Sequence, residues 1–221
     1  MEWRDLAFLH TPIAAARLRP FLPAGLRIDE FDGTAWLGVV PFRMVAVAPR
    51  FLPALPVLST FPEVNLRTYV EARGKPGVWF FSLDAASWAT VSAGRLLFNL
   101  PYHHARMTLI ERDGWHRCTS ERRGRSAVFR ARYRPRGGIT LAAPGTFAHW
   151  ATERYCLYAH SPRTGLSRTE VHHAPWPLQS AEVEIEHPTL LAAAGLAGGP
   201  SAPLALFSPG VAVVAWNGRP V

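Results

Sequence analysis

The stretch that decides the fold runs from Phe61 to Ala85 and reads FPEVNLRTYVEARGKPGVWFFSLDA. Polar and apolar side chains alternate from Glu63 to Ala72, which predicts a strand, because successive side chains of a strand point to opposite faces. Gly74 to Gly77 has the Gly and Pro content of a tight turn. Val78 to Asp84 is rich in aromatic and apolar residues and predicts the returning strand. Together these segments indicate an antiparallel hairpin.

The same pattern of short strands and turns continues on both sides of this hairpin. Asp32-Gly33 and Asp113-Gly114 are strong signals for a turn between paired strands. Pro41 lies within a predicted strand and suggests a bulge or a sheet edge, since proline cannot donate a ladder hydrogen bond. Further strands are expected at residues 26–31, 34–47, 103–111, 115–121, 126–134, 154–160, 166–174, 179–186 and 211–216. In all, about ten strands joined by tight turns predict an antiparallel barrel or two packed sheets.

Three or four peripheral helices are expected between these strands. Thr11-Pro12 fits an N-cap followed by a proline at N1 of a helix that covers residues 13–18. Apolar residues recur at roughly helical spacing over residues 87–100, and Phe147–Thr152 is a shorter candidate. His187-Pro188 opens a small apolar helix that ends at Leu196. The predicted fold class is therefore mainly β (α+β), in a single domain over residues 1–221.

Composition limits the class of protein. With 48% hydrophobic and 18% charged residues in 221, the chain is long enough and apolar enough to bury a core. Its first residues lack a signal-peptide pattern, and no run approaches the ~18 apolar residues of a transmembrane helix, so we expect a cytoplasmic, non-membrane protein. Cys118 and Cys156 lack metal-ligand spacing and are expected as free, buried thiols.

The net charge of +8 is carried by 23 arginines and one lysine, Lys75. A Schiff base needs a primary amine whose pKa is lowered by burial or by a second cation. Lys75 lies in the predicted turn between Gly74 and Pro76 and has no neighbouring lysine. Arginine stays protonated and cannot replace it. We therefore do not expect catalysis through a lysine Schiff base.

One face of the strand at residues 63–72 presents Glu63, Asn65, Arg67 and Tyr69. Polar residues on one face recur every ~7 Å, so this row could form the polar wall of a cavity. Arg67 would then hold a carboxylate, and Glu63 would act as an acid or a base. A solvated sheet face is the alternative interpretation of the same pattern.

A second candidate follows the helix at residues 87–100, where Leu100-Pro101-Tyr102-His103-His104 leads into a strand. Tyr102 and His103 could both line a pocket and move protons. Adjacent histidines on a strand point to opposite faces, so at most one of them can face a given site. A zinc site needs at least three converging ligands, and the spacing does not suggest one. We expect neither a metal nor a cofactor.

Eight arginines lie between Arg117 and Arg136, and Arg130, Arg132 and Arg134 share one face of a predicted strand. Such a basic stripe could bind phosphates, but it equally fits a charged outer face that protects a sheet edge. Neither a P-loop nor an aromatic RNA-binding signature accompanies it. Nucleic acid is therefore not the partner that we expect.

Several segments together resemble the uncharacterised bacterial YqjF-like family, a branch of the acetoacetate decarboxylase-like superfamily. These segments are residues 18–26 (LRPFLPAGL), 31–36 (FDGTAW), 40–44 (VPFRM), 61–69 (FPEVNLRTY), 77–85 (GVWFFSLDA), 100–102 (LPY) and 173–178 (HAPWPL). The resemblance implies a large antiparallel β-barrel or cone that encloses a cavity, with helices packed outside it.

In the decarboxylases of this superfamily, a glycine-bearing helix ends in a Pro-Lys-Lys motif that supplies the Schiff-base lysine. Gly94-Arg95 followed by Pro101-Tyr102-His103 resembles that helix end, with Tyr102 and His103 where the two lysines would be. Glu63 resembles, less closely, an acidic residue on a strand before the helix. The resemblance in fold therefore does not carry the lysine mechanism with it.

These observations predict a protein that binds or acts on a small carboxylate or oxo compound. Glu63, Tyr102 and His103 are the predicted catalytic residues, and Arg67, Arg43, Asn65 and Trp79 the predicted substrate-binding residues. Whether the cavity turns its ligand over, by lysine-independent lyase- or hydrolase-like chemistry, or only binds or senses it is left open. A homo-oligomer is also left open.

Overall fold

The computed structural model describes residues 1–47, 60–196 and 203–221. Thirteen strands are formed within these ranges: β1 (Glu2–Ile13), β2 (Arg27–Ile28), β3 (Ala35–Val45), β4 (Phe61–Ala72), β5 (Lys75–Ala85), β6 (Tyr102–Arg112), β7 (Trp115–Arg122), β8 (Val128–Thr140), β9 (Cys156–Ser161), β10 (Gly165–His173), β11 (Leu178–Pro188), β12 (Leu204–Ala215) and β13 (Arg219–Pro220). The α-helices are α1 (Ala15–Leu18), α2 (Trp88–Phe98), α3 (Phe147–Thr152) and α4 (Thr189–Ala193). The prediction of a mainly β fold with a few short helices is confirmed.

The predicted hairpin of β4 and β5 is present and is antiparallel, with Ala72 opposite Lys75 and Glu63 opposite Ala85. A register shift after Leu66 leaves one extra residue on β5. Strand β4 is covered on both faces, because its residues from 63 to 70 are all buried. Its polar residues are therefore enclosed by protein.

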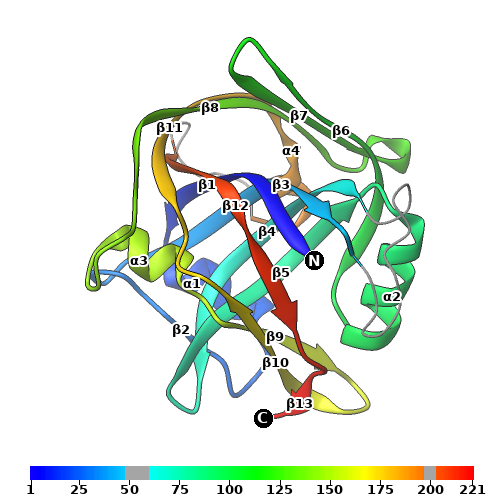
Figure 1. Cartoon of the computed structure of the whole chain (residues 1–221). Coiled ribbons are helices and arrows are strands. Elements are labelled where there is room, and N and C mark those ends of the chain that lie inside the picture. The colour runs from blue at the N-terminus through cyan, green and yellow to red at the C-terminus, as the bar shows by residue number, and fades with distance from the viewer. Residues whose placement is uncertain (48–59, 197–202) are drawn as a thin grey trace.

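The strands form one sheet that closes on itself twice, as far as the described residues show. One closed ring has nine strands, in the order β4-β5-β6-β7-β8-β11-β12-β1-β3. A smaller ring of seven strands runs β4-β5-β9-β10-β12-β1-β3. Figure 1 shows β6, β7 and β8 above the strands that both rings contain, and β9 and β10 below them. We call the five common strands, β12-β1-β3-β4-β5, the shared wall.

Each face of the shared wall packs into a different core. Val64 and Leu66 of β4 join Leu109, Phe129 and other residues in a cluster inside the larger ring. The opposite face contributes Phe8, Phe42 and Leu83 to a second cluster on the side of the smaller ring. Strand β4 alternates polar and apolar residues, a pattern that usually marks one solvent-exposed face, yet both of its faces are buried.

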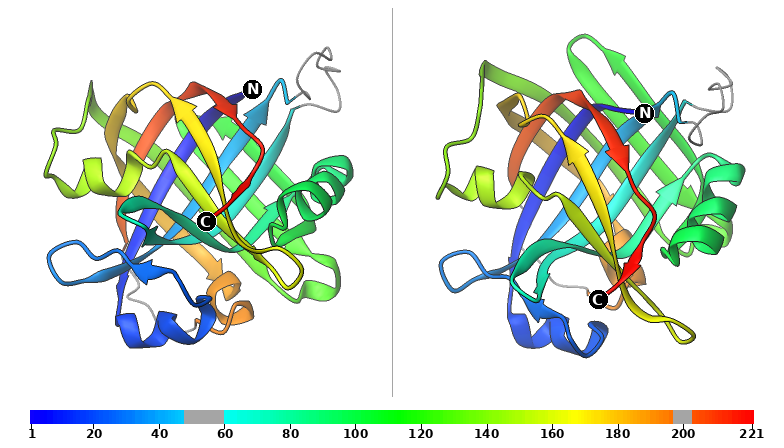
Figure 2. Two further views of the ribbon diagram at one scale, coloured as in Figure 1. Left: turned by 90° about the horizontal axis from the view of Figure 1, so that it is seen from below. Right: turned by 60° about the horizontal axis from the view of Figure 1, so that its bottom comes forward.

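The helices cover the open parts of these rings. Helix α2 connects β5 to β6, which run parallel and therefore need a crossover. Figure 2 shows α2 and α3 on opposite sides of the molecule. Helix α2 buries Val91 and Gly94, whereas Trp88, Leu96 and Leu97 are exposed. Over the described ranges, none of the helices is long and apolar enough to span a membrane.

The helix predicted at residues 13–18 is present, but its predicted start was wrong. Thr11-Pro12 lies at the end of β1 and does not begin a helix, and α1 starts only at Ala15. Pairing with β12 on one side and β3 on the other outweighs the local capping signal. The number of strands was underestimated, since β1 and the short β13 were both missed. The small C-terminal helix also begins later than predicted, because β11 continues to Pro188.

Pro41 lies in the interior of the sheet, between β1 and β4, so the edge interpretation was wrong. The bulge interpretation is confirmed. The register between β1 and β3 shifts between Arg4 and Leu9, which is the part of β1 that faces Pro41. Asp5 adopts a positive φ of 56° there. The missing N–H of proline is accommodated by an irregularity in the neighbouring strand.

We predict that Gly210→Ala lowers the free energy of unfolding by about 3 kcal/mol. Gly210 has a φ of +127°, and a Cβ atom there would lie 2.1 Å from the Trp3 carbonyl oxygen, on backbone that cannot move aside. Urea unfolding measures the change. Gly138→Ala is the matched control, because a Cβ at Gly138 meets nothing within 4 Å. Equal stability of the two variants would contradict the close approach of β12 to β1.

Candidate functional site

The row Glu63, Asn65, Arg67 and Tyr69 lies on the face of β4 that belongs to the smaller ring. These residues are 2, 5, 8 and 0% exposed, so the interpretation as a solvated sheet face was wrong. The row is buried because β3 and β5 flank it and the core of the smaller ring covers it. Polar groups at such depth need partners or a function.

Glu63 and Tyr102 form a hydrogen-bonded pair at one end of this row. The Tyr102 hydroxyl donates to Glu63 Oε2 at 3.1 Å. Burial raises the pKa of Glu63 to about 8; the hydrogen bond from Tyr102 opposes this rise, and nearby Asp84 adds to it. Burial, and then Glu63 itself, raise the pKa of Tyr102 well above its usual value. At neutral pH the pair is therefore mostly uncharged and holds two protons.

The end of α2 fixes the position of Tyr102. Arg95 Nε donates to the Tyr102 carbonyl oxygen at 2.7 Å. The Tyr102 ring lies directly against Gly94, where an added Cβ would come within 2.3 Å of the ring. Asn99 ends the helix in the left-handed region, with a φ of 50°, and its N–H bonds the Gly94 carbonyl. Gly94 leaves room for the Tyr102 ring, and the C-cap at Asn99 ends the helix just before the strand that carries Tyr102.

Arg67 is a buried cation farther along the row. Its guanidinium lies 5.5 Å from the centroids of the Phe8 and Tyr69 rings. Its Nη2 donates weakly, at 3.4 Å to the Tyr69 hydroxyl and at 3.3 Å to the Ala151 carbonyl. Among the ion pairs of the described residues, none includes Arg67.

His10 of β1 extends this polar row beyond Tyr69. Its Nε2 lies 2.6 Å from the Tyr69 hydroxyl. Complete burial, followed by the charge of Arg67, lowers the pKa of His10 to about 3, so the imidazole is neutral. This residue was not predicted. His10, Phe8 and Leu6 are each two residues apart on β1, so their side chains point to one face of that strand. Recognising β1 as a strand would therefore have placed His10 on the same face as Phe8.

Three polar atoms along the row have no hydrogen-bond partner within the described structure: Asn65 Oδ1, Arg67 Nε and His10 Nδ1. Leaving a buried polar atom unpaired costs about 1–3 kcal/mol. Seven other buried side-chain atoms of the described residues also lack a partner, but these three lie together on one wall. Bound ligand atoms or ordered water would satisfy them.

His103 lies on the opposite face of the sheet. It is opposite Asp84 in the pairing of β6 with β5, and Tyr102 is opposite Leu83. Asp84 is buried and accepts from Ser120 at 3.0 Å and from Arg122 at 2.6 and 2.8 Å. Burial and then Arg122 lower the pKa of the half-buried His103. Glu63, Asn65, Arg67 and Tyr102 thus share a face, and His103 does not join them.

Arg43 also lies outside the row. Its Nε lies 3.2 Å from Asp5 Oδ2, and its Nη2 donates to the Leu109 carbonyl at 2.8 Å. Leu109 belongs to the core of the larger ring. Arg43 therefore has partners of its own on that side of the wall.

Trp79 lines a hollow of about 310 Å³ at the surface. The other residues around it are Phe21, Phe80, Phe81, Asn99, Leu100, Pro101, Tyr158, Ala159, His160 and Ala194. Trp79 is opposite Thr68 in the pairing of β5 with β4, whereas Phe80 is opposite Arg67. Its indole therefore lies on the other side of β5 from the row.

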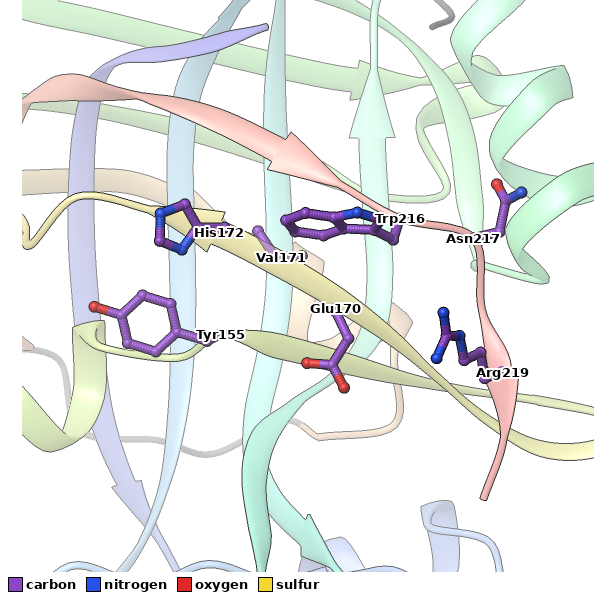
Figure 3. A pocket seen from close by; sticks show the side chains of 7 residues that line it. All are labelled: Tyr155, Glu170, Val171, His172, Trp216, Asn217 and Arg219. Carbon is purple, nitrogen blue, oxygen red and sulfur yellow. The ribbon is translucent and has the colours of Figure 1, made fainter.

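A larger hollow of about 400 Å³ lies beside β10 and the C-terminal segment (Figure 3). Tyr155, Glu170, Val171, His172, Trp216, Asn217 and Arg219 line it. Its carboxylate is already engaged, because Glu170 accepts from Lys75 Nζ at 2.5 Å and from Arg168 Nε at 2.8 Å. None of the predicted site residues lines this hollow, so we place the candidate site at the buried row.

Lys75 lies far from the Glu63–Tyr102 pair. It begins β5 opposite Ala72, nine residues along β4 from Glu63, which corresponds to roughly 30 Å. Both cysteines are free and buried, as predicted. Throughout the described ranges, no three His, Cys, Asp or Glu side chains are grouped so that they could hold a metal ion.

The arginine stripe is paired on the outer face of β8. Arg132 forms an ion pair with Glu184, Arg134 and Arg136 with Glu182, and Arg130 with Glu121. Phe129, Ala131 and Tyr133 on the other face are buried, as the alternation predicted. Acidic partners on β11 and β7 neutralise much of the stripe, which favours its interpretation as a protective outer face.

We predict that Glu63→Gln becomes more stable than the wild type as the pH rises. The folded chain binds the Glu63 proton more tightly than the unfolded chain does, so the carboxyl stabilises the fold fully below about pH 4.5. This contribution is lost as the pH rises from about 4.5 to about 8. Glutamine does not ionise, so the stability difference should change by up to ~1.4 kcal/mol per pH unit within this window.

Urea unfolding at pH 5, 7 and 9 tests this prediction. Glu30→Gln is the matched control, because Glu30 is exposed. A constant difference between Glu63→Gln and the wild type across this range would show that the Glu63 pKa is not raised.

Solved structures share this fold at low sequence identity. An acetoacetate decarboxylase-like enzyme from Sphingomonas wittichii RW1 has a TM-score of 0.67 and 17% identity, over 100% of this chain and 91% of that one. The enduracididine biosynthesis enzyme MppR complexed with pyruvate has a TM-score of 0.68 and 13% identity, over 99% and 88%. The acetoacetate decarboxylase of Legionella pneumophila has a TM-score of 0.60 and 14% identity, over 97% and 87%. The predicted acetoacetate decarboxylase-like fold is confirmed.

Sequence comparison gives the family. The uncharacterized protein YqjF of Bacillus subtilis is 38% identical over 215 residues, which cover 97% of this chain and 88% of that protein. A family model, DUF2071, described as "Uncharacterized conserved protein", matches residues 1–212. The chain belongs to this family, within the acetoacetate decarboxylase-like fold.

Proposed function

We propose that the chain binds a small oxo carboxylate along the buried row and moves a proton beside its carbonyl group without a lysine. The observation that carries this proposal is Arg67. It is a buried guanidinium without an ion pair among the described residues, with Nε unpaired, on the same face as the Glu63–Tyr102 pair. A carboxylate ligand would supply the anion that this cation lacks.

The energetics favour an anionic ligand. A buried charge is costly unless a counter-charge and good hydrogen bonds compensate it, and the two bonds that Arg67 Nη2 makes are long. A carboxylate bound to a guanidinium makes short, charge-assisted bonds and could also use Nε. Asn65 lies between Arg67 and Glu63 and could contact the middle of the ligand. The Cα atoms of Glu63 and Arg67 are ~13 Å apart, and the two side chains together with the ligand must bridge this distance.

The Glu63–Tyr102 pair suits proton transfer next to a carbonyl group. A general base works best when its pKa lies near the working pH, and the Glu63 value of about 8 meets that condition. In the proposed step, the Glu63 carboxylate removes a proton from the carbon beside the carbonyl. The two electrons of that C–H bond form the enolate C=C bond, and the carbonyl π electrons move to oxygen. The Tyr102 hydroxyl then donates a hydrogen bond to the enolate oxygen.

Neighbours of the same fold support the choice of ligand class. MppR forms a complex with pyruvate, a small oxo carboxylate, and two other neighbours are an acetoacetate decarboxylase and an enzyme like it. The distance of Lys75 from Glu63 and Tyr102 supports chemistry that does not use a Schiff base. Binding or sensing without turnover uses the same residues, and the deep burial of the row favours this alternative, because buried ligands exchange slowly.

We predict that the wild type exchanges the methyl protons of pyruvate for deuterium in D2O, followed by proton NMR. The rate should rise with pH and level off above about pH 8, as Glu63 ionises. Glu63→Gln and Tyr102→Phe should each slow exchange by about 10²–10⁴-fold. Arg67→Gln should weaken pyruvate binding about tenfold or more, as measured by calorimetry.

Lys75→Gln is the control for the mechanism and should exchange pyruvate protons at the wild-type rate. Loss of exchange in Lys75→Gln, or trapping of pyruvate on the protein by borohydride, would contradict the lysine-free mechanism. Binding that depends on Arg67 without any exchange would establish the ligand-binding alternative. Binding unaffected by Arg67→Gln would refute the site.

A further inference from the structure

The hollow of about 400 Å³ beside β10 lies on the outer surface of the smaller ring, apart from the buried row. Its floor is the face of β10 that carries Glu170 and His172. These two residues alternate with buried residues along β10, so their side chains point out of the ring. Figure 3 shows Trp216, Asn217 and Arg219 on the segment that runs alongside this face. The volume exceeds the ~150 Å³ that suffices to hold a benzene molecule.

A bulge in the C-terminal segment forms the rim of this hollow. The pairing of β12 with β10 ends at Ala215, and the pairing of β13 with β10 begins at Arg219. Between these points, residues 216–218 lie opposite residues 169–170, so the C-terminal segment carries one extra residue. Bulges re-aim side chains and are frequent beside functional sites. This bulge places Trp216 at the edge of the hollow.

The hollow has more positive than negative charge around it. Glu170 is the one carboxylate that lines it, and Lys75 and Arg168 both bind this carboxylate. Arg219 lies directly opposite Arg168 in the pairing of β13 with β10, and like charges placed opposite each other destabilise a strand pair. Within residues 1–47, 60–196 and 203–221, no ion pair includes Arg219. An anion in the hollow would supply the partner that this arginine lacks.

The shape and chemistry of the rim favour an anion that carries a ring. Trp216 is 40% exposed, so its indole offers an aromatic surface to a planar guest. The guanidinium of Arg219 matches the two oxygens of a carboxylate. The amide of Asn217, which also lines the hollow, can donate a further hydrogen bond.

We infer that this hollow is a second binding site, which takes a small aromatic carboxylate. The ring of the ligand packs against Trp216, and its carboxylate binds Arg219. Glu170 does not exclude the anion, because Lys75 and Arg168 offset its charge. The site lies outside the smaller ring and the buried row lies inside it, so each can be filled without the other.

Calorimetry at low salt with three probes tests the inference. The probes are indole-3-acetate, its neutral amide indole-3-acetamide, and acetate, which lacks the ring. The wild type should bind indole-3-acetate about tenfold or more tightly than it binds either of the other two. Equal affinity for the acid and the amide, or for indole-3-acetate and acetate, would overturn the inference.

Two variants, each with a matched control, locate the bound probe. Arg219→Gln should weaken indole-3-acetate binding by about tenfold or more, because the guanidinium is lost. Arg163→Gln makes the same change of charge in the exposed turn between β9 and β10 and should have no effect. Trp216→Ala should also weaken binding, whereas Trp88→Ala, at an exposed tryptophan on α2, should not. Affinities unchanged by Arg219→Gln and Trp216→Ala would refute the site.

Two further results separate this site from the row and from a purely structural role. Arg67→Gln should leave indole-3-acetate binding unchanged; loss of binding would place the probe in the row and overturn the second site. Without a probe, Arg219→Gln should unfold at a higher urea concentration than the wild type at low salt, because it removes the repulsion from Arg168. A lower unfolding midpoint would show that Arg219 stabilises the fold, and would contradict its assignment to an anion.

Discussion

The burial of β4 on both faces is the constraint on which the rest of the structure depends. The shared wall closes two rings at once, so neither face of β4 meets solvent. One face can be apolar and join the core of the larger ring. The other face carries a glutamate, an asparagine, an arginine and a tyrosine into the smaller ring, where each must find a partner or serve a ligand.

The same hairpin places two carboxylates in different environments. Asp84 of β5 faces the larger ring and has a guanidinium and a hydroxyl as partners, from Arg122 and Ser120. Glu63 faces the smaller ring and has the phenol of Tyr102 as its hydrogen-bond partner. Burial without a cation raises the pKa of Glu63 and makes it suitable for proton transfer. Asp84 instead connects β5 to the end of β7.

The sequence was sufficient for the hairpins of β4 with β5 and of β6 with β7, since turn residues and alternating side chains are local signals. The hairpin expected across Asp32-Gly33 was wrong, because β2 pairs with β4 and only Phe31 and Thr34 form a bridge across that turn. The shared face of Glu63, Asn65 and Arg67 followed from the period of a strand. Its burial did not follow, because burial depends on β9 and β10 closing a second ring through pairings distant in sequence. His10 was missed because β1 was missed. The local sequence Thr11-Pro12 resembled a helix start, whereas β1 forms through pairing with β12 and β3, which are distant in the sequence. The side of the sheet on which Arg43, Trp79 and His103 lie also depends on ring closure.

The central claim is that Glu63 retains its proton near neutral pH, beside Tyr102 and on the same face of β4 as the buried Arg67. The most direct measurement is a carbon-13 NMR titration of the glutamate side-chain carboxyl groups, with the Glu63 signal assigned by its absence in Glu63→Gln. The account predicts a midpoint near pH 8 for that signal. A midpoint near the ordinary glutamate value of about 4.3 would contradict it.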